Sequence, residues 1–136
     1  MVKVVVDTNV LISALVGHGK PRRLITLLLE AHELIVSKEM TTELIEVLRR
    51  AKFRKIKNRH VDNFLSILVG RAKLVRVEGR LNVIVEDPDD NLVLGTACGG
   101  RANYLVSGDK HLLMLKQFRS IRIVSVREML ELLDGV

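Results

Sequence analysis

Short β-branched runs alternate along this chain with longer stretches in which apolar residues recur at helical spacing. Runs of the first kind are typical of strands covered on both faces, and the second pattern is typical of helices with one buried face. The runs predict strands at residues 3–6, 34–36, 74–77, 103–106 and 121–124. The spacing predicts helices at residues 10–16, 21–29, 38–51, 60–72, 88–99, 110–116 and 126–133.

Alternating strands and helices with short connections predict a parallel sheet with right-handed crossovers and helices on both faces. The expected fold is therefore α/β, a three-layer α/β/α sandwich. The 136 residues fit one domain, residues 1–136, and no repeat or low-complexity linker divides them. In such sheets ligands bind at the carboxyl ends of the strands, so functional residues are expected just after strands.

Cysteine content and hydropathy indicate a compartment. The single cysteine, Cys98, cannot form an intramolecular disulfide, and no leader-like pattern opens the sequence. No apolar run approaches the roughly 20 residues of a membrane span, so no membrane partner is expected. We expect a protein of the reducing cytoplasm.

Two aspartates follow predicted strands. Asp7 comes directly after the run at 3–6, and Asp109 comes shortly after the run at 103–106. Each could cap the helix that follows it. If their strands are neighbours in a parallel sheet, both carboxylates face the same crevice.

Glu43 is the third candidate, on the predicted helix at 38–51, for which Ser37 is a plausible N-cap. At 100° per residue Glu43 lies about 40° from Val47, at the margin of the apolar arc, whereas Glu39 and Glu46 point further toward water. A solvated residue at that margin is the alternative interpretation.

Asp90 is the fourth candidate, in the segment Asp87-Pro88-Asp89-Asp90. Asp87 has the chemistry of an N-cap and Pro88 that of a first helical residue, so capping is already provided. Asp90 precedes Val93, Leu94 and Ala97 by three, four and seven residues, which places it on the inward stripe. Burying an unpaired carboxylate on that stripe costs several kcal/mol of free energy, which favours a cation bound to Asp90. The alternative is that Asp90 is a second acid that caps the start of the helix.

Several carboxylates in one pocket repel each other unless a cation offsets their charge. Oxygen ligands without paired cysteines or histidines favour Mg²⁺ or Mn²⁺ over zinc. Such ions activate water for attack on a phosphodiester, so metal-dependent hydrolysis of nucleic acid is the expected chemistry.

These residues stand in motifs that resemble the PIN-domain ribonuclease family, including VapC-type toxins of prokaryotic toxin-antitoxin pairs. The similar segments, in family order over nearly the whole chain, are VVDTNV at 5–10, TTEL at 41–44, DPDDN at 87–91 and VSGDKHLL at 106–113. The resemblance implies that Asp7, Glu43, Asp90 and Asp109 bind the metal, supported by Asn9 and Ser107. It also implies a five-stranded parallel sheet, hydrolysis of single-stranded RNA, a homodimer and a small antitoxin partner.

The net charge of +6 arises in one segment. The rest of the chain holds 15 basic and 16 acidic residues. The segment itself holds seven basic residues and no acid: Arg49, Arg50, Lys52, Arg54, Lys55, Lys57 and Arg59. Together with Lys110 they are candidate RNA contacts. A solvated helix face, or a surface for a protein partner, is the alternative.

Other classes of protein fit less well. A non-catalytic RNA-binding or adaptor module with the same fold is the main alternative, although all four acids are present. A phosphoacceptor receiver domain needs an acidic pair after the first strand, where Asp7 stands alone. No Gly-x-x-x-x-Gly-Lys-Ser/Thr loop occurs, which disfavours a P-loop nucleotidase.

Overall fold

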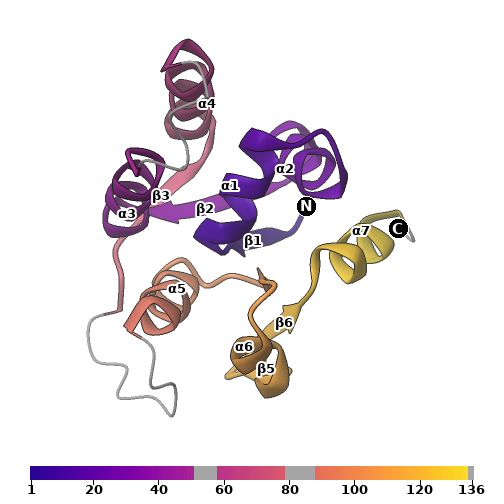
Figure 1. Ribbon diagram of the computed structural model, residues 1–136. Helices are drawn as coiled ribbons and strands as arrows, with labels where there is room; N and C mark the ends of the chain where they lie inside the picture. The colour runs from indigo at the N-terminus through magenta and orange to yellow at the C-terminus, as the bar shows by residue number, and fades with distance from the viewer. Residues whose placement is uncertain (51–57, 79–87, 135–136) are drawn as a thin grey trace.

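Strands and helices alternate along the chain in a computed structural model that describes residues 1–50, 58–78 and 88–134 (Figure 1). The helices in these ranges are α1 (Thr8–Val16), α2 (Lys20–Ala31), α3 (Lys38–Leu48), α4 (Asn58–Arg71), α5 (Pro88–Gly99), α6 (Lys110–Leu115) and α7 (Val126–Asp134). The strands are β1 (Lys3–Val6), β2 (Glu33–Ser37), β3 (Lys73–Val75), β4 (Tyr104–Val106), β5 (Gln117–Phe118) and β6 (Ile121–Val124). All the predicted elements are therefore confirmed, with shifts of a few residues at their ends.

The strands of the described residues form one sheet in the order β3-β2-β1-β4-β6-β5. The first five of these are mutually parallel, which confirms the predicted five-stranded parallel sheet. The chain moves outward from β1 to β2 and β3, and then returns to the other side of β1 to form β4 and β6. The strand order therefore reverses between β1 and β4, where Val6 is the register partner of Val106.

A sixth strand was not predicted. The two residues of β5 pair antiparallel with β6, Gln117 with Arg122 and Phe118 with Ile121. The connecting turn holds Arg119 in the left-handed region, with φ of 55°. Two residues are too few to show a period of two, so the pattern of the sequence carries no signal for this strand.

Alternate residues of β1 enter two separate cores. Val4 and Val6 pack with residues of α1, α2 and α7, whereas Val5 packs with residues of α5 and with Leu112 of α6. Figure 1 shows α1 and α2 on one side of β1 and β2 and α5 on the other side. Because both faces of the sheet are covered, its strands read as continuous apolar runs, and the predicted three layers are confirmed.

The helix α3 begins and ends for identifiable reasons. Ser37 is its N-cap, as predicted, and its Oγ accepts a 3.2 Å hydrogen bond from the backbone N–H of Met40. The helix ends at Leu48 and does not continue to residue 51. Leu48 is its last buried residue, and Arg49 and Arg50 are exposed, so no apolar packing extends the helix.

None of the helices that can be described here combines the length and the apolar character needed to cross a membrane.

Candidate active site

The point where the strand order reverses brings together residues about one hundred positions apart. The backbone N–H of Asp7 donates to the carbonyl of Val106 at 2.9 Å, which continues the pairing of β1 with β4. The fully buried hydroxyl of Ser107 donates to Asp7 Oδ2 at 2.8 Å and accepts from the backbone N–H of Asp109 at 3.0 Å. Ser107 therefore links the two predicted strand-end aspartates.

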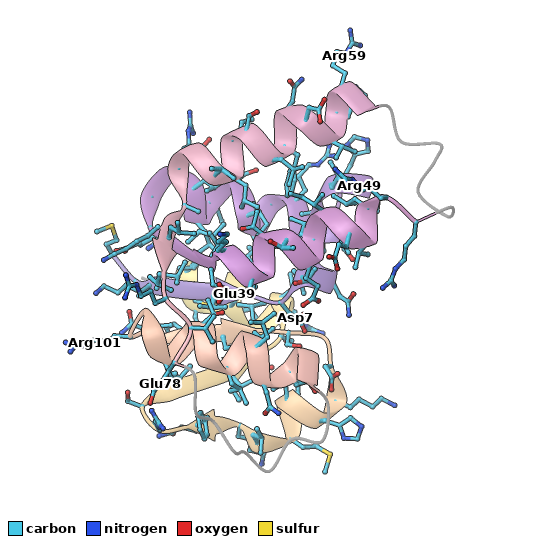
Figure 2. All side chains as sticks on the ribbon, turned by 90° about the vertical axis from the view of Figure 1, so that its left-hand side faces the viewer. Asp7, Glu39, Arg49, Arg59, Glu78 and Arg101 are labelled. Atoms are coloured by element: carbon cyan, nitrogen blue, oxygen red, sulfur yellow. The ribbon has the colours of Figure 1, made fainter. Side chains whose placement is uncertain are left out.

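Asp7 is 7% exposed (Figure 2). Burial raises the pKa of its carboxyl above the ordinary value of 3.8, and the nearby Asp109 carboxylate acts in the same direction. The Ser107 hydroxyl and the backbone of Asn9 lower the same pKa and partly offset these effects. A buried carboxylate with a raised pKa is one whose charge a bound cation would stabilise.

Asp109 also has the capping role that was its alternative interpretation. It is the N-cap of α6, and its Oδ1 accepts from the backbone N–H groups of His111 at 2.7 Å and Leu112 at 3.4 Å. These bonds fix the orientation of the half-buried carboxylate. Capping by one oxygen is compatible with a metal-binding role for the other.

Asp90 is 4% exposed, near the start of α5. The side chains of Val93, Leu94 and Ala97 are buried in the core between α5 and the sheet, which confirms that Asp90 begins the inward stripe. The predicted N-cap Asp87 and the side chain of Asp89 lie outside the described part of the structure.

Glu43 is half-buried, whereas Glu39 and Glu46 are exposed, which confirms the order predicted from the helical wheel. These three glutamates line a shallow hollow of about 460 Å³ on α3 together with Lys38 and Thr42.

The structure thus links two of the four predicted acids, Asp7 and Asp109, through the hydroxyl of Ser107. Within residues 1–50, 58–78 and 88–134, no group of three or more His, Cys, Asp or Glu side chains lies close enough to hold a metal ion. The donor chemistry nevertheless fits a hard divalent cation, because Asp7 and Asp90 are buried carboxylates. The assignment of all four acids to one metal centre stays a prediction.

Two polar residues beside Asp7 differ from expectation. The side chain of Asn9, a predicted supporting residue, is exposed, and its backbone is the part that acts on Asp7. Thr8 was not predicted as a site residue. It is 2% exposed, and its Oγ1 has no hydrogen-bond partner within the described part of the chain. Its position directly after a strand-end aspartate was the available signal.

Four of the predicted RNA contacts are described by the structure, and all four are exposed: Arg49, Arg50, Arg59 and Lys110. Arg49 follows α3 and Arg59 lies in the first turn of α4 (Figure 2), whereas Lys110 directly follows Asp109. The other four lie outside the described residues: Lys52, Arg54, Lys55 and Lys57.

The fold and the strand-end residues define an α/β protein in which two aspartates are linked through a serine where the strand order reverses. The sequence profile of the PIN domain matches residues 3–111, and the chain belongs to the PIN-domain family. A solved structure with a similar fold is VapBC2 from Rickettsia felis bound to a DNA fragment from their promoter. The TM-score is 0.64 at 17% sequence identity, covering 90% of this chain and 98% of that chain. A comparison with curated protein sequences gave no significant match.

Proposed function

We propose that this PIN-domain protein is an endoribonuclease that uses Mg²⁺ or Mn²⁺ to hydrolyse single-stranded RNA. The observation that carries the proposal is the Asp7–Ser107–Asp109 arrangement where the strand order reverses. Nuclease activity is typical of the PIN-domain family, and the buried Asp90 stands where the family resemblance implies a further metal ligand.

Asp7, Glu43, Asp90 and Asp109 would hold the cation. When bound, it would activate water and stabilise the charge that develops on the phosphodiester. The Ser107 hydroxyl donates to one oxygen of Asp7 and so fixes the orientation of this carboxylate. The backbone N–H groups of α6 do the same for Asp109. Because both carboxylates are already held in one orientation, their side chains need to rearrange less when a cation binds.

The test is cleavage of a labelled single-stranded RNA by the purified protein with Mn²⁺, with Mg²⁺ and with EDTA. We expect cleavage in both metals, none in EDTA, and recovery when Mn²⁺ is added in excess. Cleavage that persists in EDTA would contradict the metal mechanism. RNA binding without cleavage in either metal would favour the alternative, a non-catalytic RNA-binding module.

A second proposal concerns a protein partner, which the similarity to VapC-type toxins and to the VapBC2 structure supports. An apolar groove of about 640 Å³ runs between α1, α2 and α4 and is lined by residues that include Leu15, Ile25, Phe64 and Ile67. We propose that an amphipathic helix of a small antitoxin occupies it. A homodimer stays a prediction from the family resemblance.

The rim of this groove is basic. Arg22 donates to the carbonyls of Ala14 at 3.0 Å and Leu15 at 2.9 Å, and its Nη1 lies 2.6 Å from Nδ1 of His18. His60 lines the groove as well. An occupant with acidic residues beside its apolar stripe would complement this rim.

A further inference from the structure

Two hydroxyl groups meet in the interior of the protein, outside the strand-end site. Ser37, at the end of β2, and Thr96, on α5, are both 0% exposed, and their Oγ and Oγ1 atoms lie 2.9 Å apart. They are 59 positions apart in the sequence. Apolar side chains of similar size would fill the same space without the cost of burying polar groups, so the pair provides something other than packing.

The neighbouring hydrogen bonds decide which of the two hydroxyl groups is the donor. The Thr96 hydroxyl donates its proton to the carbonyl of Leu92 at 2.8 Å, so Ser37 must be the donor in the bond between the two side chains. Ser37 Oγ in turn accepts from the backbone N–H of Met40. The chain of bonds therefore runs from the first turn of α3, through two side chains, into the backbone of α5.

The two helices joined in this way carry two of the proposed metal ligands. Glu43 lies six residues after Ser37 on α3, and Asp90 lies six residues before Thr96 on α5. At 1.5 Å of rise per residue, each acid is about 9 Å along its helix from the hydroxyl pair.

Figure 2 shows that the helices run in opposite directions. Glu39, near the start of α3, and Arg101, just after the end of α5, lie toward one side, and Arg49, just after α3, lies toward the other. Because the helices are antiparallel, both acids are displaced from the hydroxyl pair in the same direction. Glu43 and Asp90 are therefore held at the same level along the two helices.

We infer that Ser37 and Thr96 are positioning residues for the metal site, and that their hydrogen bond sets the register of α3 against α5. The inference rests on the proposed function, because it assumes that Glu43 and Asp90 hold the same cation. Apolar contacts between helices tolerate small axial shifts, whereas a 2.9 Å hydrogen bond between buried groups does not. Loss of the bond would leave the fold intact and let the two carboxylates move out of register.

The experiment measures Mn²⁺ affinity by titration calorimetry, with thermal melts and RNA cleavage beside it. Thr96→Val removes the hydroxyl at nearly constant volume, Ser37→Ala removes its partner, and Thr96→Ser retains the hydroxyl. We expect Thr96→Val to lower Mn²⁺ affinity by roughly tenfold, the scale typical of residues that orient metal ligands. The KM for RNA should stay within about twofold of the parent value, because the pair lies away from any surface that RNA could contact.

Three comparisons separate positioning from general stability. Thr96→Ser should recover most of the lost affinity. The double variant should bind Mn²⁺ no more weakly than the weaker single variant, because both changes remove the same bond. Leu28→Ala, which truncates a buried side chain of α2 that does not line the groove, should lower the melting temperature and leave Mn²⁺ affinity unchanged.

The possible outcomes are distinct. If Thr96→Val bound Mn²⁺ as the parent does and only melted at a lower temperature, as Leu28→Ala should, the pair would be a packing contact. That outcome would overturn this inference and leave the proposed function standing. If the parent protein bound no Mn²⁺, the proposed function would fail, and this inference would fail with it.

Discussion

Ser107 donates its hydroxyl proton to Oδ2 of Asp7 across the β1–β4 boundary, a contact between residues 100 positions apart. The same oxygen of Ser107 accepts the backbone N–H of Asp109. A single buried side chain therefore ties the carboxylate of Asp7 to the backbone of Asp109. The geometry explains why a serine, with one proton to donate and lone pairs to accept, suits this position.

Asp7→Asn should abolish RNA cleavage and raise the melting temperature at pH 7. Burial raises the pKa of Asp7 in the folded state, so the contribution of Asp7 to stability is fully present below about pH 3.8 and is lost as the pH rises through the folded pKa. The asparagine removes this penalty while its side-chain oxygen can still accept from Ser107. We expect a rise of a few degrees at pH 7, since 1 kcal/mol shifts the melting temperature by roughly 4 °C.

The pH series provides the check on this explanation. The difference in melting temperature between Asp7→Asn and the parent should shrink as the pH is lowered, because the buried Asp7 carboxyl becomes protonated in the folded state and no longer carries a charge there. Asp62→Asn, at an exposed position of α4, is the matched control and should change neither stability nor cleavage. A gain in stability that is independent of pH would rule out the burial of charge as its cause.

Asp90→Asn should fold like the parent and lose Mn²⁺ affinity together with nearly all turnover. The change is almost isosteric, and the side chain begins the inward stripe of α5. Thermal melts, calorimetric titration and RNA cleavage would be measured in parallel with Asp62→Asn. An active, metal-binding Asp90→Asn would remove this residue from the site and favour its alternative role as a helix-start acid.

Replacing basic residues of the tract at 49–59 should weaken RNA binding and reduce its dependence on salt. Each lost contact with a phosphate of single-stranded RNA should lower the slope of log K against log salt by about 0.7. The variant carries Ser at Lys52, Arg54, Lys55 and Lys57, and Arg127→Ser on α7 is a control for the loss of an exposed charge. An unchanged slope would assign the tract to a solvated face or a protein partner.

If the proposed antitoxin helix occupies the groove between α1, α2 and α4, Ile67→Asp should prevent its binding without affecting stability or RNA cleavage. Ile67 is 50% exposed and lines the groove between α1, α2 and α4, so a charge there meets the apolar stripe of an occupant. Val69→Asp provides a close control, because Val69 is 62% exposed on the same helix and does not line the groove. Equal affinities of the two variants in calorimetry would place the partner elsewhere.

The local pattern of the sequence was sufficient for most of the architecture. The apolar runs of β1 and β2 predict strands because a sheet covered on both faces requires apolar side chains in both directions. The helical spacing around Asp90 distinguishes it from its neighbours, because a period of 3.6 residues fixes which side chains share a face. These properties depend on residues within a few positions of one another.

Tertiary structure decided the contacts that join distant segments. The sequence identified Asp7 and Asp109 as strand-end acids, but only the pairing of β1 with β4 brings both to Ser107. The two-residue strand β5 and the buried Ser37–Thr96 pair leave no periodic signal, because each depends on a partner far along the chain or on a tight turn. The sequence by itself determined which residues could carry the chemistry, and the order of the strands decided which of them meet.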